Sequence, residues 1–291
     1  MRLVRKNDRC GIMMWILSAI LASMCSVGQS AFTKIASTNE KTTGLMYINT
    51  LKVGAALVFF LLISFYKMQF HLPTVLFALI FGFAMFFSTL FGYMALMCGS
   101  MALTSLIVSY SVIIPCIFGI MFLGETLNFM RILGIVLLLI SMYLLKHRAN
   151  NLKFNKHWFA YVAITFFCNG ICSVIQKLHQ TVYPSSYYNE FMIYSIIVAF
   201  TLFLVLAIYK KEEKNTGVTK YAVLAGILMG VGNYLTLVLS SKVNATVLFP
   251  IISAFSMLCN VIVSKLYFKD KFNVMQLTGI GLGVFSVLII K

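Results

Sequence analysis

Acidic residues are scarce in this chain. Its 291 residues include seven Asp and Glu against 23 Lys and Arg, and 10% are charged, where soluble proteins average about a quarter. The acids are Asp8, Glu40, Glu125, Glu190, Glu212, Glu213 and Asp270. Only Glu190 falls inside an apolar stretch, in a first helical turn, where an acid suits the positive helix end. The sequence therefore argues against a deep carboxylate proton relay.

Catalytic and metal-binding patterns are also missing. We find no nucleophile beside a base, no phosphate-binding loop and no paired carboxylates, and the four histidines lie near predicted helix ends. Seven cysteines, an odd number, argue against a disulfide framework. Cys168 and Cys172 are one turn apart but have no neighbouring His or acid, which favours packing over metal ligation. We expect no enzyme activity, no metal and no cofactor.

Apolar runs dominate instead. Hydrophobic residues make up 61% of the chain and mean hydropathy is +0.95. A helical membrane span needs about 20 mostly apolar residues, and the sequence predicts ten, at about 11–33, 44–66, 73–97, 101–123, 128–145, 157–179, 187–209, 218–240, 245–266 and 272–290. No stretch alternates as barrel strands do. The predicted fold class is an all-α membrane protein with ten transmembrane helices, the first an uncleaved span.

The chain contains an internal duplication. Residues 100–146 recur at 245–291, and Cys25–Gln29 recurs as Cys172–Gln176 at nearly the same offset. We therefore divide the chain into two five-helix repeats, 1–148 and 149–291. An odd number of spans per repeat inverts the second repeat relative to the first. Inverted repeats are typical of secondary transporters, whose substrate site lies near the membrane midplane at the repeat interface.

The turn Leu123–Leu127, which contains Gly124 and Glu125, together with Gly134 and Gly279 in the last span of each repeat, resembles the EamA-type drug/metabolite transporter superfamily. The resemblance covers essentially the whole chain, although the second turn has Asp270 in place of the Glu. It implies a carrier with both termini in the cytoplasm. It does not specify the substrate, which in similar proteins ranges from amino acids and sugars to quaternary amines.

Polar residues within the spans are the candidates for a substrate cavity. Ser26 and Gln29 share a face of the first span, and the sixth repeats them as Ser173 and Gln176 with Asn169 one turn earlier. The alternative is hydrogen bonding between helices, for which small polar residues are common. The remaining candidates, which packing could equally explain, are Tyr93, Tyr110, Asn233, Tyr234 and Asn260.

Four charged residues are candidates for coupling or gating: Lys34, Lys52, Lys177 and Glu190. Lys52 lies well inside the second span, where we expect its ammonium to snorkel to the interface or to find a polar partner. Similar proteins often have an arginine near this position, which favours a structural or gating role. Glu190 is the first candidate should transport be coupled to protons.

Topology signals disagree. Arg2, Arg5, Lys6 and Arg9 precede the first span and indicate a cytoplasmic N-terminus, whereas the count over all loops favours the opposite side. We follow the first span and expect a plasma (inner) membrane protein with both termini inside.

The net charge of +16 is scattered over short loops, so we expect contact with anionic lipid headgroups rather than nucleic acid. We expect a monomer, with a dimer as the alternative.

The sequence thus predicts a secondary transporter for a small polar or amphipathic metabolite. Transport would proceed by alternating access, as the two halves rock about a midplane site, with or without proton coupling. The first alternative is a carrier for choline-like quaternary amines or cationic drugs, although few buried acids are available as counter-ions and Lys34 and Lys177 would repel a cation. The second is a membrane enzyme or receptor, for which no polar cluster at one interface is evident.

Overall fold

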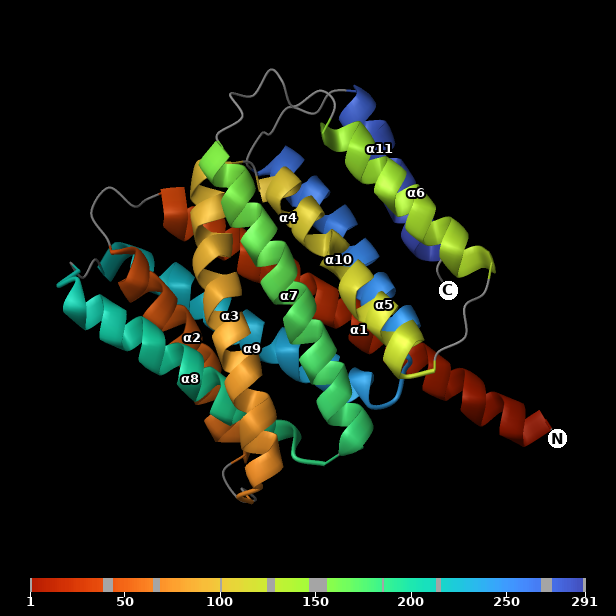
Figure 1. Cartoon of the computed structure of the whole chain (residues 1–291), viewed down its shortest axis with the longest axis horizontal. Coiled ribbons are helices and arrows are strands. Elements are labelled where there is room, and N and C mark those ends of the chain that lie inside the picture. Colours follow the sequence, from red (N-terminus) through yellow and green to blue (C-terminus); the bar gives the residue numbers. More distant parts are fainter. Residues whose placement is uncertain are drawn as a thin grey trace.

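A computed structural model describes residues 2–38, 44–64, 69–99, 101–124, 129–146, 156–184, 186–212, 216–267 and 274–289. Every regular element within these ranges is a helix (Figure 1). The elements are α1 (Arg2–Thr38), α2 (Leu45–Ser64), α3 (Leu72–Cys98), α4 (Met101–Ser109), η2 (Tyr110–Val112), α5 (Ile113–Phe122), α6 (Phe129–Lys146), α7 (Lys156–Val182), α8 (Tyr188–Tyr209), α9 (Thr216–Ser240), α10 (Ala245–Leu266) and α11 (Val274–Ile289).

Each of the ten predicted stretches is occupied by helix. Eight helical segments in the described ranges are long and apolar enough to cross a membrane; α6 and α11 are not among them. Large apolar side chains lie exposed along the outside of these helices, including Leu62, Met121, Phe122 and Phe129. A helical surface of this kind is stable in lipid rather than in water. The chain is therefore an all-helical, multi-pass membrane protein.

The predicted fourth span is not one straight helix. It consists of α4, the 3₁₀ turn η2 and α5, and Pro115 follows η2 by three residues. A proline ring clashes with the carbonyl four residues earlier, which here belongs to Ser111 inside the turn. Pro115 therefore accounts for the break. Pro250, by contrast, lies inside α10 without interrupting it.

The two repeats are interleaved rather than side by side. α1 packs mainly on α9, and its equivalent in the second repeat, α7, packs mainly on α3. In the same way α2 contacts α9 while α8 contacts α3, and α2 and α8 contact each other. If each helix is replaced by its equivalent in the other repeat, the α1–α9 contact becomes the α7–α3 contact and the α2–α9 contact becomes the α8–α3 contact. A twofold relation between the repeats requires this. Most of the helix packing is therefore between repeats.

Glycine allows α9 to approach α2 closely. A Cβ atom at Gly226 would collide with the main-chain carbonyl of Lys52, and one at Gly230 would lie 2.7 Å from the ring of Phe59. The small-xxx-small pair in α9 thus packs within the chain, as in other membrane helix contacts.

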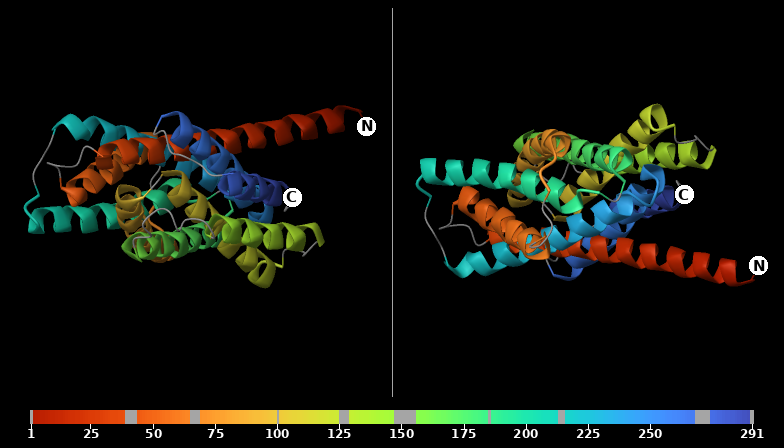
Figure 2. Two further views of the ribbon diagram at one scale, coloured as in Figure 1. Left: turned by 90° about the horizontal axis from the view of Figure 1, so that it is seen from above. Right: turned by 90° about the horizontal axis from the view of Figure 1, so that it is seen from below.

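The pair α6 and α11 lies side by side at one edge of the molecule (Figure 1). The Ser141 hydroxyl donates to the main-chain carbonyl of Gly279, 2.5 Å away, and links the two helices. Among the other helices, α10 makes the main contact with this pair, through α11. The start of α1 projects beyond the rest of the bundle in all three views (Figures 1 and 2).

Candidate functional site

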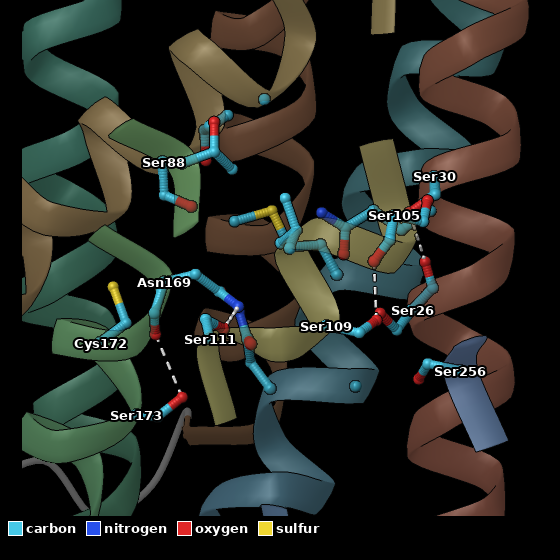
Figure 3. Close-up of a pocket in the computed structure, with 18 of the residues that line it drawn as sticks. Ser26, Ser30, Ser88, Ser105, Ser109, Ser111, Asn169, Cys172, Ser173 and Ser256 are labelled. Atoms are coloured by element: carbon cyan, nitrogen blue, oxygen red, sulfur yellow. Dashed lines mark hydrogen bonds between the residues drawn. The ribbon is translucent and has the colours of Figure 1, made fainter. Parts of the chain in front are cut away.

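A partly open cavity of about 300 Å³ lies between helices of both repeats. Its walls come from α1, α3, α4, η2, α7, α9 and α10, with one residue from α2. Its volume is at the lower end of the roughly 300–1,000 Å³ typical of small-molecule sites. Figure 3 shows serine hydroxyls and the Asn169 amide among the side chains that line it.

The polar pair that the sequence repeats lines this cavity in both copies. Ser26 and Gln29 come from α1, and Ser173 and Gln176 come from α7. In Figure 3, Ser26 and Ser173 lie on opposite sides of the cavity. The two equivalent helices therefore supply two facing polar walls.

Four further sequence candidates line the same cavity: Tyr93, Asn169, Asn233 and Asn260. The Asn169 amide donates to the Ser111 hydroxyl at 2.9 Å, so α7 is bonded to the 3₁₀ turn within the cavity wall (Figure 3). The helix break before Pro115 thus places a polar side chain of the first repeat against one of the second.

Tyr110 does not line the cavity. It is 1% exposed, and its hydroxyl lies 2.6 Å from the Ser141 hydroxyl. Because the Ser141 proton is donated to Gly279, the Tyr110 hydroxyl acts as the donor. The side chain therefore ties η2 to α6 and does not face the cavity, contrary to the sequence-based prediction.

Tyr234 also lies elsewhere. Its ring packs against Phe60 with centroids 6.3 Å apart. It lines a separate, mainly apolar hollow that Trp15 and Val247 also border. The cavity and this hollow lie against two faces of the same stretch of α9: Asn233 and Thr236 line the cavity, whereas Tyr234 and Leu235 line the hollow. The sequence repeat does not distinguish the two faces.

Several hydroxyls in the cavity wall already donate to their own helix. The acceptor is in each case the carbonyl four residues earlier, at 2.7–3.1 Å, and the donors are Ser30, Thr33, Ser109, Thr165, Ser173 and Thr236. A hydroxyl that has donated its proton still has lone pairs. These walls therefore offer hydrogen-bond acceptors to a molecule in the cavity.

Three buried polar atoms of the lining have no hydrogen-bond partner in the part of the chain that the structure describes. They are Gln176 Nε2, Ser256 Oγ and Asn260 Oδ1. Buried polar atoms are normally paired, because an unpaired one loses its solvation without compensation. One amide donor, one hydroxyl and one amide acceptor are thus available to a bound molecule.

Lys52 is the α2 residue of the lining and, among the described residues around the cavity, the single charged one. It is 4% exposed. Snorkelling would carry its ammonium to an exposed helix end, whereas the structure places Lys52 at the wall of the central cavity.

Lys34 and Lys177 do not line the cavity. The Lys34 ammonium donates to the carbonyls of Leu96 and Gly99, the latter at 2.8 Å, where α3 ends. The Lys177 ammonium donates to the carbonyls of Ser240 and Val243 at 3.0 and 2.9 Å, where α9 ends. The last carbonyls of a helix lack partners within it and carry partial negative charge. Each lysine therefore caps a helix of the opposite packing pair.

Glu190 is buried in the first turn of α8 and lies outside the cavity. Its carboxylate accepts a hydrogen bond from the main-chain amide of Gln69 at 3.1 Å. This bond joins the segment before α3 to the start of α8.

A histidine network that sequence reasoning missed links α3 to α7. Thr74 Oγ1 lies 2.9 Å from His71 Nδ1 and 3.2 Å from His179 Nε2, and His179 Nδ1 lies 2.9 Å from the Gln180 amide. The His71 ring stacks on Tyr187 and the His179 ring on Phe191. The two histidines are far apart in the sequence, so no spacing motif reveals the network.

The sequence reasoning also overlooked Ser253 and Ser256, which line the cavity from α10. A signal for them exists, because Ser253, Ser256 and Asn260 follow helical spacing and share one face of α10.

Comparisons with known proteins agree with this architecture. No curated protein matches the chain. A solved structure titled "Crystal structure of protein" superposes with a TM-score of 0.72, covering 95% of this chain and 96% of the other at 13% identity, which establishes a shared fold. The EamA-like transporter family matches residues 13–146 and again 156–291. With two copies of the family's unit spanning most of its length, the chain belongs to the EamA-like transporter family.

Proposed function

We propose that this protein is a secondary transporter that moves a small polar metabolite by alternating access through the central cavity. The observation that carries the proposal is a polar cavity walled by both repeats inside a helical bundle whose outer surface is apolar. Polar side chains inside a membrane bundle that gather around a cavity often mark the path of a substrate. Membership of the EamA-like family supports the same conclusion.

In the membrane, α6 and α11 complete a set of ten spans, in which α4, η2 and α5 count as one and the second repeat is inverted relative to the first. We place both termini in the cytoplasm and the protein in the plasma (inner) membrane, on the basis of Arg2, Arg5, Lys6 and Arg9. Basic loops would contact anionic headgroups. The twofold packing within one chain favours a monomer.

The moving bodies are not the two repeats. Because the repeats interleave, rocking one against the other would separate α1 from α9 and α3 from α7, the most extensive helix contacts. The cavity instead lies between an α1–α9 unit and an α3–α7 unit, each with one helix from each repeat. Relative motion of these units would open the cavity while the contacts of α1 with α9 and of α3 with α7 stay intact.

Lys34 and Lys177 suit a gating role in this scheme. Lys34 is in the α1–α9 unit and caps α3, whereas Lys177 is in the α3–α7 unit and caps α9. α3 and α9 end at opposite ends of the bundle (Figure 1). Each lysine thus ties the two units together at one end of the cavity, and opening at that end would break its bonds.

Transport is tested by uptake into proteoliposomes. Ligands are first selected by the thermal stabilisation that binding gives the purified protein, with a panel of amino acids, organic acids, sugars, nucleosides, choline and polyamines. We expect Gln29→Ala and Gln176→Ala each to reduce uptake of the selected compound at least tenfold. Ser18→Ala and Thr181→Ala, on the same two helices but outside the cavity lining, are the matched controls. Unchanged uptake in both glutamine variants would refute the assignment of the cavity as the transport site.

Proton coupling is tested separately. Uptake with and without an imposed pH gradient is compared in the unmodified protein and in Glu190→Gln. Coupling through this carboxylate predicts a response to the gradient that the variant loses. Gradient-independent uptake in the unmodified protein would exclude it.

The alternative cargo, a quaternary amine or cationic drug, is less compatible with the cavity. Lys34 and Lys177, which the sequence analysis expected to repel a cation, are bonded to carbonyls outside the cavity. Lys52, however, lines the cavity directly, and no acid among the described lining residues offsets its charge. Binding of choline in the ligand panel would favour this alternative.

A further inference from the structure

The position of Lys52 is fixed by the packing of its backbone. α2 and α9 approach most closely where Gly226 faces the Lys52 carbonyl, with no room for a side chain between them. The stem of Lys52 therefore starts from a rigid point deep in the bundle, and its side chain is 4% exposed and borders the cavity. This differs from a lysine at a helix end, whose flexible stem lets the ammonium reach water.

Among the described residues, no hydrogen bond or ion pair joins the Lys52 ammonium to another protein group. Glu190 and Glu212, the two acids that make hydrogen bonds in the described ranges, bind main-chain amides at Gln69 and Tyr47. Neither lines the cavity. A buried ammonium is strongly disfavoured without a partner of opposite charge or several acceptors.

The other two span lysines show what a satisfied ammonium looks like in this protein. Lys34 and Lys177 each donate to two main-chain carbonyls at a helix C-terminus. Lys52 lies within α2 and has no helix end beside it. Because Lys52 lines the cavity, its charge is available to a molecule that enters it.

The charges and hydrogen-bonding groups of the lining limit which molecule can bind in the cavity. The single positive charge of Lys52 matches one carboxylate group, whereas a phosphate dianion would leave a negative charge without a partner. Gln176 Nε2 is an additional unpaired donor for an anionic oxygen. The hydroxyls of α1, α4, α7 and α9 that already donate to their own helices are available as acceptors for hydroxyl or ammonium groups.

We propose that Lys52 binds the carboxylate of the transported molecule, and that the cargo is a small monocarboxylate carrying hydroxyl or ammonium donors. This assignment rests on the proposed transport function and narrows its substrate class. It also gives Lys52 a direct role in substrate binding, in place of the structural or gating role that the sequence suggested.

The test is ligand binding to the purified full-length protein, measured by isothermal titration calorimetry with matched pairs. The probes are glycerate and glyceramide, alanine and alaninamide, and glycerol 3-phosphate as the dianion. We expect at least one carboxylate to bind and its amide to bind at least tenfold more weakly. Equal affinity for acid and amide, preference for the phosphate, or no binding of either carboxylate at millimolar concentration would overturn the proposal.

Variants at position 52 locate the binding. Lys52→Arg should retain carboxylate affinity within about tenfold, and Lys52→Met should abolish it. Without ligand, Lys52→Met should melt at an equal or higher temperature than the unmodified protein, because an unpaired buried charge is removed. A lower melting temperature together with unchanged carboxylate affinity would identify Lys52 as a purely structural residue.

Uptake by proteoliposomes separates this proposal from the transport function. Lys52-dependent binding of a carboxylate without any uptake would leave the binding site standing and refute transport. Uptake of a neutral or cationic compound at equal rates by the unmodified protein and by Lys52→Met would support transport and refute the carboxylate site at Lys52.

Discussion

Lys34 and Lys177 make equivalent contacts from the two repeats. Each extends from the later part of its helix to the C-terminal carbonyls of a helix in the opposite packing pair: Lys34 to Leu96 and Gly99, and Lys177 to Ser240 and Val243. The acceptors correspond through one common offset in the sequence. The duplication has therefore preserved a three-dimensional contact whose acceptor residue types differ between the copies.

The first prediction concerns these two contacts. Lys34→Met should accelerate hydrogen–deuterium exchange at Met97–Gly99, and Lys177→Met should do so at Ser241–Asn244, about tenfold or more, because a hydrogen bond to a charged group contributes about 1.5–3 kcal/mol. Mass spectrometry of peptides in detergent measures both. Each variant is the control for the other. Faster exchange at both loops in a single variant would contradict the view that the two lysines cap their helices independently.

The second prediction concerns the moving units. A Cβ atom at Gly232 would lie 3.4 Å from Cys25 Cβ, close to the roughly 3.5–4.5 Å that a disulfide requires. Gly232→Cys should therefore cross-link α9 to α1 under mild oxidation. If the two helices move as one unit, transport should continue after cross-linking at the rate of the reduced variant. Inhibition that a reductant reverses would show that α1 and α9 separate during the cycle; the unmodified protein under the same oxidant is the control.

The third prediction concerns the contact of α2 with α9. Gly226→Ala should destabilise the protein by about 1–3 kcal/mol through overpacking, since the added methyl group meets backbone rather than a movable side chain. Gly281→Ala in α11, where nothing lies within 4 Å of the added carbon, should be neutral or stabilising by up to about 1 kcal/mol. Thermal unfolding in one detergent compares the two. Equal melting temperatures would contradict the close approach.

The fourth prediction separates Tyr110 from the cavity. Tyr110→Phe removes its hydrogen bond to Ser141 and should lower stability by about 0.5–1.5 kcal/mol, while the affinity for the transported molecule stays unchanged. Tyr93→Phe, which alters a residue of the cavity lining, is the comparison. A loss of affinity in Tyr110→Phe equal to that in Tyr93→Phe would show that Tyr110 belongs to the binding site.

Apart from α1, which begins nine residues before the predicted first span, the sequence predicted the helix ends to within a few residues, because apolar runs end at charged or turn-forming residues, as at Lys146 and Lys156. The duplication also predicted that Gln29 and Gln176 would lie in equivalent places. It did not reveal the roles of Lys34 and Lys177. Main-chain carbonyls accept their hydrogen bonds, and because every residue has such a carbonyl, the sequence does not mark the acceptors. The sequence placed Tyr110 in the cavity for a related reason. Its partner, Ser141, lies in another helix, and nothing in the sequence marks that serine as the partner of a tyrosine.

The interleaved order of helices also lay outside the sequence pattern. Hydropathy locates spans but not their neighbours, and two five-helix repeats could pack side by side with the same profile. Lys52 shows the limit most clearly. A lysine near the middle of a span is compatible with snorkelling, with a buried partner or with a cavity, and the choice depends on α9, whose glycine is distant in sequence.

The pairing of α1 with α9 also has a consequence for biosynthesis. α1 ends at Thr38 and α9 begins at Thr216, so a ribosome completes most of the chain before the first helix meets its main partner. Until then the polar face that carries Ser26 and Gln29 must be shielded by other groups in the membrane. A nascent chain arrested before Thr216 should therefore remain sensitive to proteolysis and depend on the insertion machinery, and the protein becomes self-supporting only when α9, its eighth span, arrives.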